Sequence, residues 1–109
     1  MTAITAMPTL DAMIHHLRHP ETWPAGFEWD YSYATACAVG LAHGLWPDST
    51  TSFSYSDLAH TLGLSPHAGY IIFTGLTAPW WRRPFRFHDR QALVTAADVA
   101  SALERERAT

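Results

Sequence analysis

The stretch from Ser56 to Phe73 contains two short helical segments with almost no linker between them. Gly63 follows the apolar residues of the first segment, and glycine is the residue that most often ends a helix in the left-handed conformation. Ser65 and Pro66 follow, and a serine N-cap with proline at the first helical position begins a new helix. We therefore expect a helix over about 55–62, a tight turn, and a helix from 66 to about 73 or 74.

The same outline is that of the DNA-binding helix-turn-helix motif, in which a small residue such as Ala59 lets the two helices approach closely. The second helix, however, contains no Arg, Lys, Asn or Gln, the residues on which base recognition largely depends. Gly69 also stands where a larger aliphatic residue normally packs inward. The pattern favours simple packing of two core helices, with nucleic-acid binding by residues 55–74 as the alternative.

Three other segments are typical of helices. An apolar stripe predicts a helix over about 10–18, small and apolar residues predict a central helix over about 33–45, and a Thr95–Asp98 capping pattern predicts a last helix over about 96–105. The alternation of Phe and Arg after Pro84 permits a short strand. The predicted fold is mainly α, a compact bundle of about five helices, with one short β-hairpin allowed near residues 84–94.

Length and composition limit the class of protein. A chain of 109 residues with 48% hydrophobic residues is sufficient for one domain with its own core, so we expect a single globular domain over 1–109, frayed at about 1–7 and 106–109. The net charge of −3 argues against a chain that binds nucleic acid over its whole surface. No run is apolar for long enough to cross a membrane, and the N-terminus lacks the pattern of a signal peptide. We expect a cytoplasmic protein without membrane partners.

Gly40 and Gly44 recur four residues apart in the predicted central helix. Each glycine weakens a helix by about 1 kcal/mol relative to alanine. We therefore expect another part of the backbone to pack closely against this edge.

Cys37 is the single cysteine, and a cysteine with a histidine can form a hydrolytic pair. Nucleophilic cysteines usually lie exposed at a helix N-terminus, whereas the predicted boundaries place Cys37 more than one turn inside the central helix on its apolar side. A buried structural thiol is the favoured interpretation. His88 and Asp89 would be its best partners in the catalytic alternative.

His15 and His19 are one helical turn apart, so both could face one metal ion. No third ligand accompanies them in the sequence. We therefore expect a solvated, histidine-rich helix end, with no metal and no cofactor.

Residues 79–90 hold four of the seven arginines and four aromatic residues. Tryptophan and arginine are favoured anchors of protein interfaces, so this segment is the best candidate for partner binding. The same residue types could bind single-stranded nucleic acid through 80–90, or the rings could fill the core while the arginines pair within the chain. The candidate partner-binding residues are Trp80, Trp81, Arg82, Arg83 and Arg86.

Several short motifs follow one another along the chain: a loop from Trp23 to Trp29, Cys-Ala-Val-Gly-Leu-Ala at 37–42, Ala-His-Thr-Leu-Gly-Leu at 59–64, Ile72-Phe73, and Thr-Ala-Ala-Asp-Val at 95–99. In this layout the chain resembles a group of small bacterial and phage proteins. The resemblance covers about residues 10–103 and consists of packing residues. It implies a phage or mobile-element origin and no particular activity.

The sequence therefore favours a small, cytosolic, non-enzymatic adaptor or inhibitor that binds a protein. A nucleic-acid-binding regulator that uses 55–74 or 80–90 is the second hypothesis. A Cys37-dependent enzyme is the third.

Overall fold

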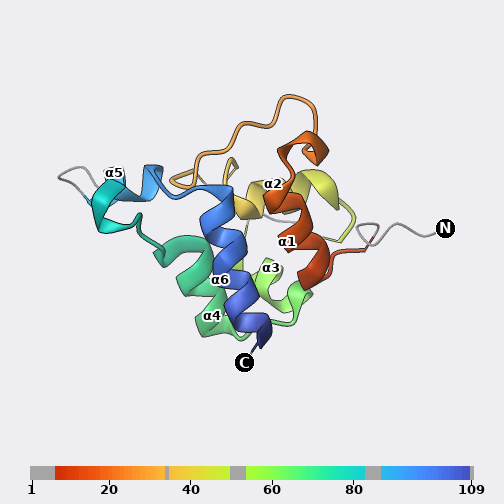
Figure 1. Cartoon of the computed structure of the whole chain (residues 1–109). Coiled ribbons are helices and arrows are strands. Elements are labelled where there is room, and N and C mark those ends of the chain that lie inside the picture. Colours follow the sequence, from red (N-terminus) through yellow and green to blue (C-terminus); the bar gives the residue numbers. More distant parts are fainter. Residues whose placement is uncertain (1–6, 34, 50–53, 83–86, 109) are drawn as a thin grey trace.

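The structure is a computed structural model that describes residues 7–33, 35–49, 54–82 and 87–108, with the backbone alone for 87–89 (Figure 1). Helices dominate these ranges, which contain no strand, and the mainly α prediction is confirmed. The α-helices are α1 (Leu10–Arg18), α2 (Ala38–Leu45), α3 (Tyr55–Leu62), α4 (Pro66–Tyr70), α5 (Phe87–Ala92) and α6 (Ala96–Ala108). Three shorter turns join them: η1 (Pro20–Thr22), the π-helical η2 (Ile71–Gly75) and η3 (Trp80–Arg82).

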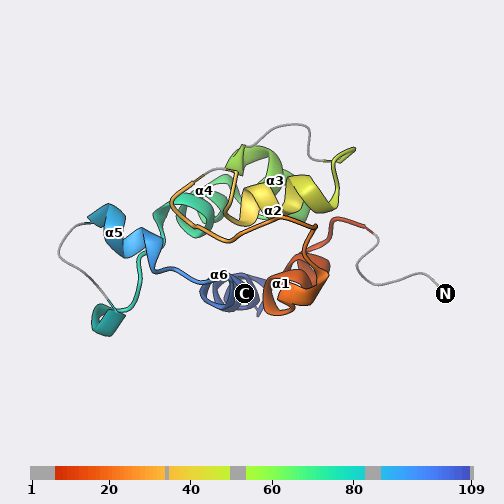
Figure 2. The same ribbon diagram turned by 90° about the horizontal axis from the view of Figure 1, so that it is seen from above.

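The helices form two layers. Figure 2 shows α1 and α6 side by side in one layer and α2, α3 and α4 in the other. The core lies between the layers, where side chains from four of these helices are almost completely buried: Met13, Leu17, Leu41, Leu58, Val99 and Leu103. No helix within the described ranges has the length and apolar character needed to cross a membrane.

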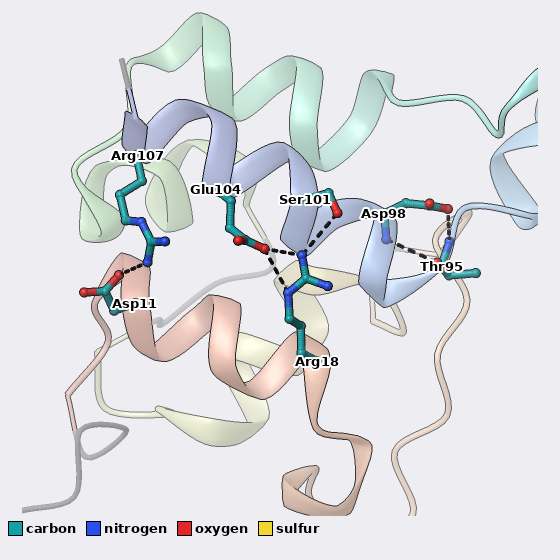
Figure 3. Close-up of polar contacts among 7 residues, drawn as sticks. All are labelled: Asp11, Arg18, Thr95, Asp98, Ser101, Glu104 and Arg107. Carbon is teal, nitrogen blue, oxygen red and sulfur yellow. Dashed lines mark hydrogen bonds and ion pairs between the residues drawn. The ribbon is translucent and has the colours of Figure 1, made fainter.

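Ion pairs link the antiparallel helices α1 and α6 along their outer edge (Figure 3). Arg18 donates to Glu104 and, at 3.2 Å, to the hydroxyl of Ser101, while Arg107 pairs with Asp11 near the other end. These side chains are substantially exposed, and such pairs typically contribute only about 0–1 kcal/mol each. The ion pairs therefore favour one register between two helices that apolar burial holds together.

The corner between α3 and α4 forms as the sequence predicts. Gly63 has a φ of +77°, and the side chain of Ser65 accepts a hydrogen bond from the N–H of Ala68. A Cβ atom added to Gly69 would lie 2.4 Å from the Cβ of Ala59, so no larger side chain fits at this contact. The α-helical geometry ends at Tyr70, and η2 continues the chain as a π-turn to Gly75.

Two predicted elements differ from the structure. The central helix begins at Ala38 and not near residue 33, because the Asp30 carboxylate accepts from both the N–H and the hydroxyl of Ser32 and favours a turn there. The predicted β-hairpin near 84–94 is wrong, since residues 87–92 form α5. A helix pairs its backbone groups locally, whereas a strand needs a neighbour, and the described ranges contain no strand to supply one. The last helix also continues to Ala108, beyond the predicted end at 105.

The two glycines of α2 have different surroundings. A Cβ on the buried Gly40 would lie 2.3 Å from the backbone carbonyl of Thr35, which confirms the expected close approach at this position. Gly44 is exposed, and its nearest neighbour would be the ring of Pro24 at 3.1 Å. Among the described residues, another part of the backbone therefore packs closely against Gly40 but not against Gly44.

We predict that Gly40→Ala lowers the free energy of unfolding by about 1–3 kcal/mol through overpacking. The matched variant Gly44→Ala should change it by less than about 1 kcal/mol, because a gain in helix propensity offsets the contact with Pro24. Urea unfolding of both variants measures the difference. Equal stability of the two variants would contradict the close approach at Gly40.

Candidate functional site

Residues 76–94 form an arm that leaves the two-layer body after η2 and returns to it before α6 (Figures 1 and 2). The arm carries η3 and α5, which lie at one end of the molecule beyond the core helices. Residues 83–86 of the arm lie outside the described ranges. The arm contains most of the segment that the sequence singles out for partner binding.

Two aromatic residues from the loop before α2 hold the two ends of the arm. The buried hydroxyl of Tyr31 donates to the carbonyl of Ile72 at 2.7 Å and accepts from the N–H of Leu76 at 3.1 Å, where the arm begins. The indole N–H of Trp29 donates to the carbonyl of Val94 at 2.8 Å, where the arm ends. Burial also raises the pKa of Tyr31, which keeps this hydroxyl protonated and able to donate.

Further polar contacts connect the arm internally and to the body. Arg82 donates to the carbonyl of Leu93 at 2.9 Å and to the carboxylate of Asp98 in α6 at 2.7 Å. The side-chain amide of Gln91 donates to the carbonyl of Thr74 at 2.8 Å. The outgoing and returning parts of the arm are therefore tied together and to the start of α6.

Asp98 serves both the arm and the cap of α6. Partial burial acts to raise its pKa, but hydrogen bonds from the N–H of Thr95 and from Arg82, together with the positive charge of Arg82, outweigh it. The pKa of Asp98 consequently lies below its ordinary value. The ionised form makes the anchoring ion pair with Arg82, and protonation of the carboxylate removes the attraction between the two charges.

Trp80 and Trp81 lie on η3 with their indole rings in solvent. Their exposed fractions are 72% and 67%, and their ring centroids lie 5.9 Å apart in an edge-to-face arrangement. Such exposure forgoes the burial of two of the largest apolar side chains, which is unfavourable for the isolated chain. The tryptophan pair (Trp80 and Trp81) is thus an apolar surface on a turn whose base is fixed.

A cavity of about 200 Å³ lies beside the base of this turn. Apolar side chains from the two ends of the arm form one part of its lining, and polar side chains from α6 form another. The cavity is lined by Leu76, Thr77, Pro79, Val94, Asp98, Ser101 and Arg105.

The five predicted partner-binding residues do not share one environment in the structure. Trp80 and Trp81 are exposed, whereas Arg82 pairs within the chain as in the structural alternative considered for these arginines. Arg83 and Arg86 lie outside the described residues. Arg105 also lies at this site and is not among the predicted residues. It lines the cavity together with Asp98 and Ser101 of α6, where the ends of the arm pack beside this helix.

Cys37 lies at the N-cap of α2, and its expected position more than one turn inside the helix is therefore wrong. Its side chain is nevertheless buried, with 4% of its surface exposed, beside a cavity of about 250 Å³ that Tyr31, Tyr55 and Gln91 also line. His88 and Asp89 fall in α5, but their side chains lie outside the described part of the chain. The catalytic alternative with His88 and Asp89 therefore concerns side chains outside the described part of the chain.

His15 and His19 face each other as predicted for residues one turn apart. Their rings stack with centroids 4.4 Å apart, and Nδ1 of His19 lies 2.9 Å from a carboxylate oxygen of Glu21. Within the described ranges, no three ligand-type side chains are grouped so that they could hold a metal ion.

No protein-family model, curated protein or solved structure matches this chain. The resemblance to small bacterial and phage proteins consequently stays a prediction.

We predict that Asp98→Asn lowers the free energy of unfolding by about 1 kcal/mol at pH 7, because it removes a partly buried partner of Arg82. The depressed pKa of Asp98 stabilises the fold above the unfolded pKa of about 3.9, and this stabilisation is lost as the pH falls further. The difference from the parent should therefore stay constant from pH 7 to about pH 5 and narrow as the pH falls below about 4. Denaturant unfolding at several pH values measures it.

Asp48→Asn is the matched control, since Asp48 is exposed and makes no hydrogen bond or ion pair with the described residues. It should leave stability unchanged at pH 7. A loss equal to that of Asp98→Asn would show that the effect does not come from the Arg82 contact.

We also predict that Cys37 reacts with a thiol reagent much more slowly in the native chain than in denaturant, because its side chain is buried. Time-resolved labelling followed by mass spectrometry measures both rates. Fast labelling of the native chain would instead favour the catalytic alternative.

Proposed function

We propose that this protein is a small non-enzymatic adaptor or inhibitor whose protein partner binds the tryptophan pair on the arm. The observation that carries the proposal is the joint exposure of Trp80 and Trp81 on a turn that is anchored at its base. Tryptophan is among the residues that contribute most to binding when they become buried at an interface.

The anchoring of the arm supports the same proposal. Tyr31 and Trp29 hold its two ends, and Arg82 ties η3 to α6. An apolar surface that is already positioned loses less conformational entropy on association than one that must first be ordered. A partner would therefore gain most of the free energy of burying the two indoles.

Nucleic acid is the less favoured partner. Arg82 is already paired with Asp98, and residues 55–74 contain no Arg or Lys that could contact phosphates. The net charge of −3 also opposes binding of a polyanion. The four arginines of 79–90 are the residues that support the nucleic-acid alternative.

The cytoplasmic location and the phage or mobile-element origin belong to the same proposal. They rest on the composition and on the motifs shared with small bacterial and phage proteins. An inhibitor of a host complex would be consistent with such an origin.

We predict that Trp80→Ala/Trp81→Ala abolishes partner capture from a host-cell extract and leaves the melting temperature nearly unchanged, because neither ring is buried in the isolated chain. Tyr33→Ala is the matched control, since Tyr33 is an aromatic residue with 64% of its surface exposed outside the arm. Quantitative mass spectrometry of the captured proteins and thermal unfolding are the measurements.

A captured protein that is retained by Tyr33→Ala and lost with the double variant supports the proposal. A large drop in melting temperature with no change in capture would assign the two rings a structural role and contradict it.

A further inference from the structure

The cavity at the base of η3 has an apolar side and, among the described residues that line it, one available cation. Leu76, Pro79 and Val94 supply the apolar lining, and Pro79 directly precedes Trp80 in the chain. Arg105 lines the same cavity from α6 and is exposed. Pro79 therefore places the cavity next to the start of η3, and the two exposed indoles belong to the residues that follow.

Arg105 differs from the other arginines whose side chains the structure describes. Arg18 and Arg107 pair with acidic residues across the α1–α6 contact, and Arg82 pairs with Asp98. Arg90 also has an interaction within the chain. Arg105 alone in this described set makes no hydrogen bond or ion pair, so its guanidinium is available to a bound group.

The charges around the cavity favour an anionic ligand group. Among the described residues of the lining, Asp98 is the only acidic one, and its charge is offset by Arg82. Arginine binds carboxylates in a planar, two-point geometry, which suits recognition of an acidic side chain or a chain end.

The size of the cavity favours a side chain over a whole small molecule. Its volume of about 200 Å³ is below the range of about 300–1,000 Å³ that is typical of small-molecule sites. The apolar part of the lining suits a hydrocarbon side chain, and Arg105 in the polar part suits a carboxylate. These features favour a peptide over a nucleic acid as the occupant.

We infer that the cavity and the tryptophan pair together receive an acidic peptide segment of a protein partner, with an apolar side chain in the cavity and a nearby carboxylate on Arg105. This inference rests on the proposed function and specifies the chemistry of the partner. Trp80 and Trp81 cover the apolar part of the segment, and Arg105 selects its charge.

Selection from a displayed library of random peptides tests this inference, with the purified full chain as the target. We expect enriched peptides to combine a large apolar residue with Asp or Glu close to it. Synthetic copies should bind at least about tenfold more weakly to Arg105→Glu, because the variant loses a charge-assisted contact and introduces repulsion. Fluorescence anisotropy measures the affinities.

Arg107→Glu is the matched control, because it makes the same charge change on the same helix but at the contact with Asp11 (Figure 3). It should weaken peptide binding by less than about threefold, as expected for a screened charge away from the site. Circular dichroism melting of both variants verifies that each is folded. A similar loss of peptide affinity in the two variants would overturn the role of Arg105.

The outcomes separate this inference from the proposed function. Peptides that need the tryptophan pair but carry no acidic residue, and that bind Arg105→Glu normally, overturn the inference and leave the proposed function standing. If the chain self-associates and the association requires the tryptophan pair, the occupant is a second copy of the chain. That result also overturns the inference. Failure to select any peptide overturns the inference, and salt-dependent binding of a single-stranded oligonucleotide in its place overturns both.

Discussion

The buried hydroxyl of Tyr31 fixes the point at which the helical body ends and the arm begins. It accepts from the N–H of Leu76 and donates to the carbonyl of Ile72, so both sides of the π-turn are held by one side chain. A π-turn leaves backbone groups without the regular helical partners, and such turns are often found at functional sites. Gln91 satisfies a further carbonyl, that of Thr74, from the returning part of the arm. The exit direction of the chain is thus specified by side chains that lie far apart in the sequence.

This exit explains how the tryptophan pair can stay in solvent. The core is already filled by side chains from both helical layers, and the arm carries η3 beyond them. Arg82 contributes to the same arrangement, because its bonds to Leu93 and Asp98 fix η3 relative to the returning part of the arm and to α6. Exposure of two indoles is unfavourable for the isolated chain, but anchored exposure favours association with a partner.

Local signals in the sequence predict the helices well and the site only in part. Thr9, Ser54, Ser65 and Gly63 act within their own turns, so their caps can be recognised without knowledge of the fold. The start of α2 depends on a turn at Asp30, and α5 lies where an alternating pattern favours a strand. The cavity was not predictable, because it forms between the arm and α6, and no local pattern specifies which faces of the two segments meet.

The arginines show why residue type alone cannot identify such a site. Arg18 of α1 pairs with Glu104 of α6, and Arg107 of α6 pairs with Asp11 of α1. Arg105 lies two positions before Arg107 on the same helix and lines the cavity. Successive residues of a helix are about 100° apart, so side chains two positions apart point to nearly opposite sides. Because α1 packs on one side of α6 and the arm on another, the two arginines have different surroundings. Arg107 pairs within the chain, and Arg105 remains available. This division follows from helix packing, and the charge that packing leaves unused is the one that we propose for recognition of a partner.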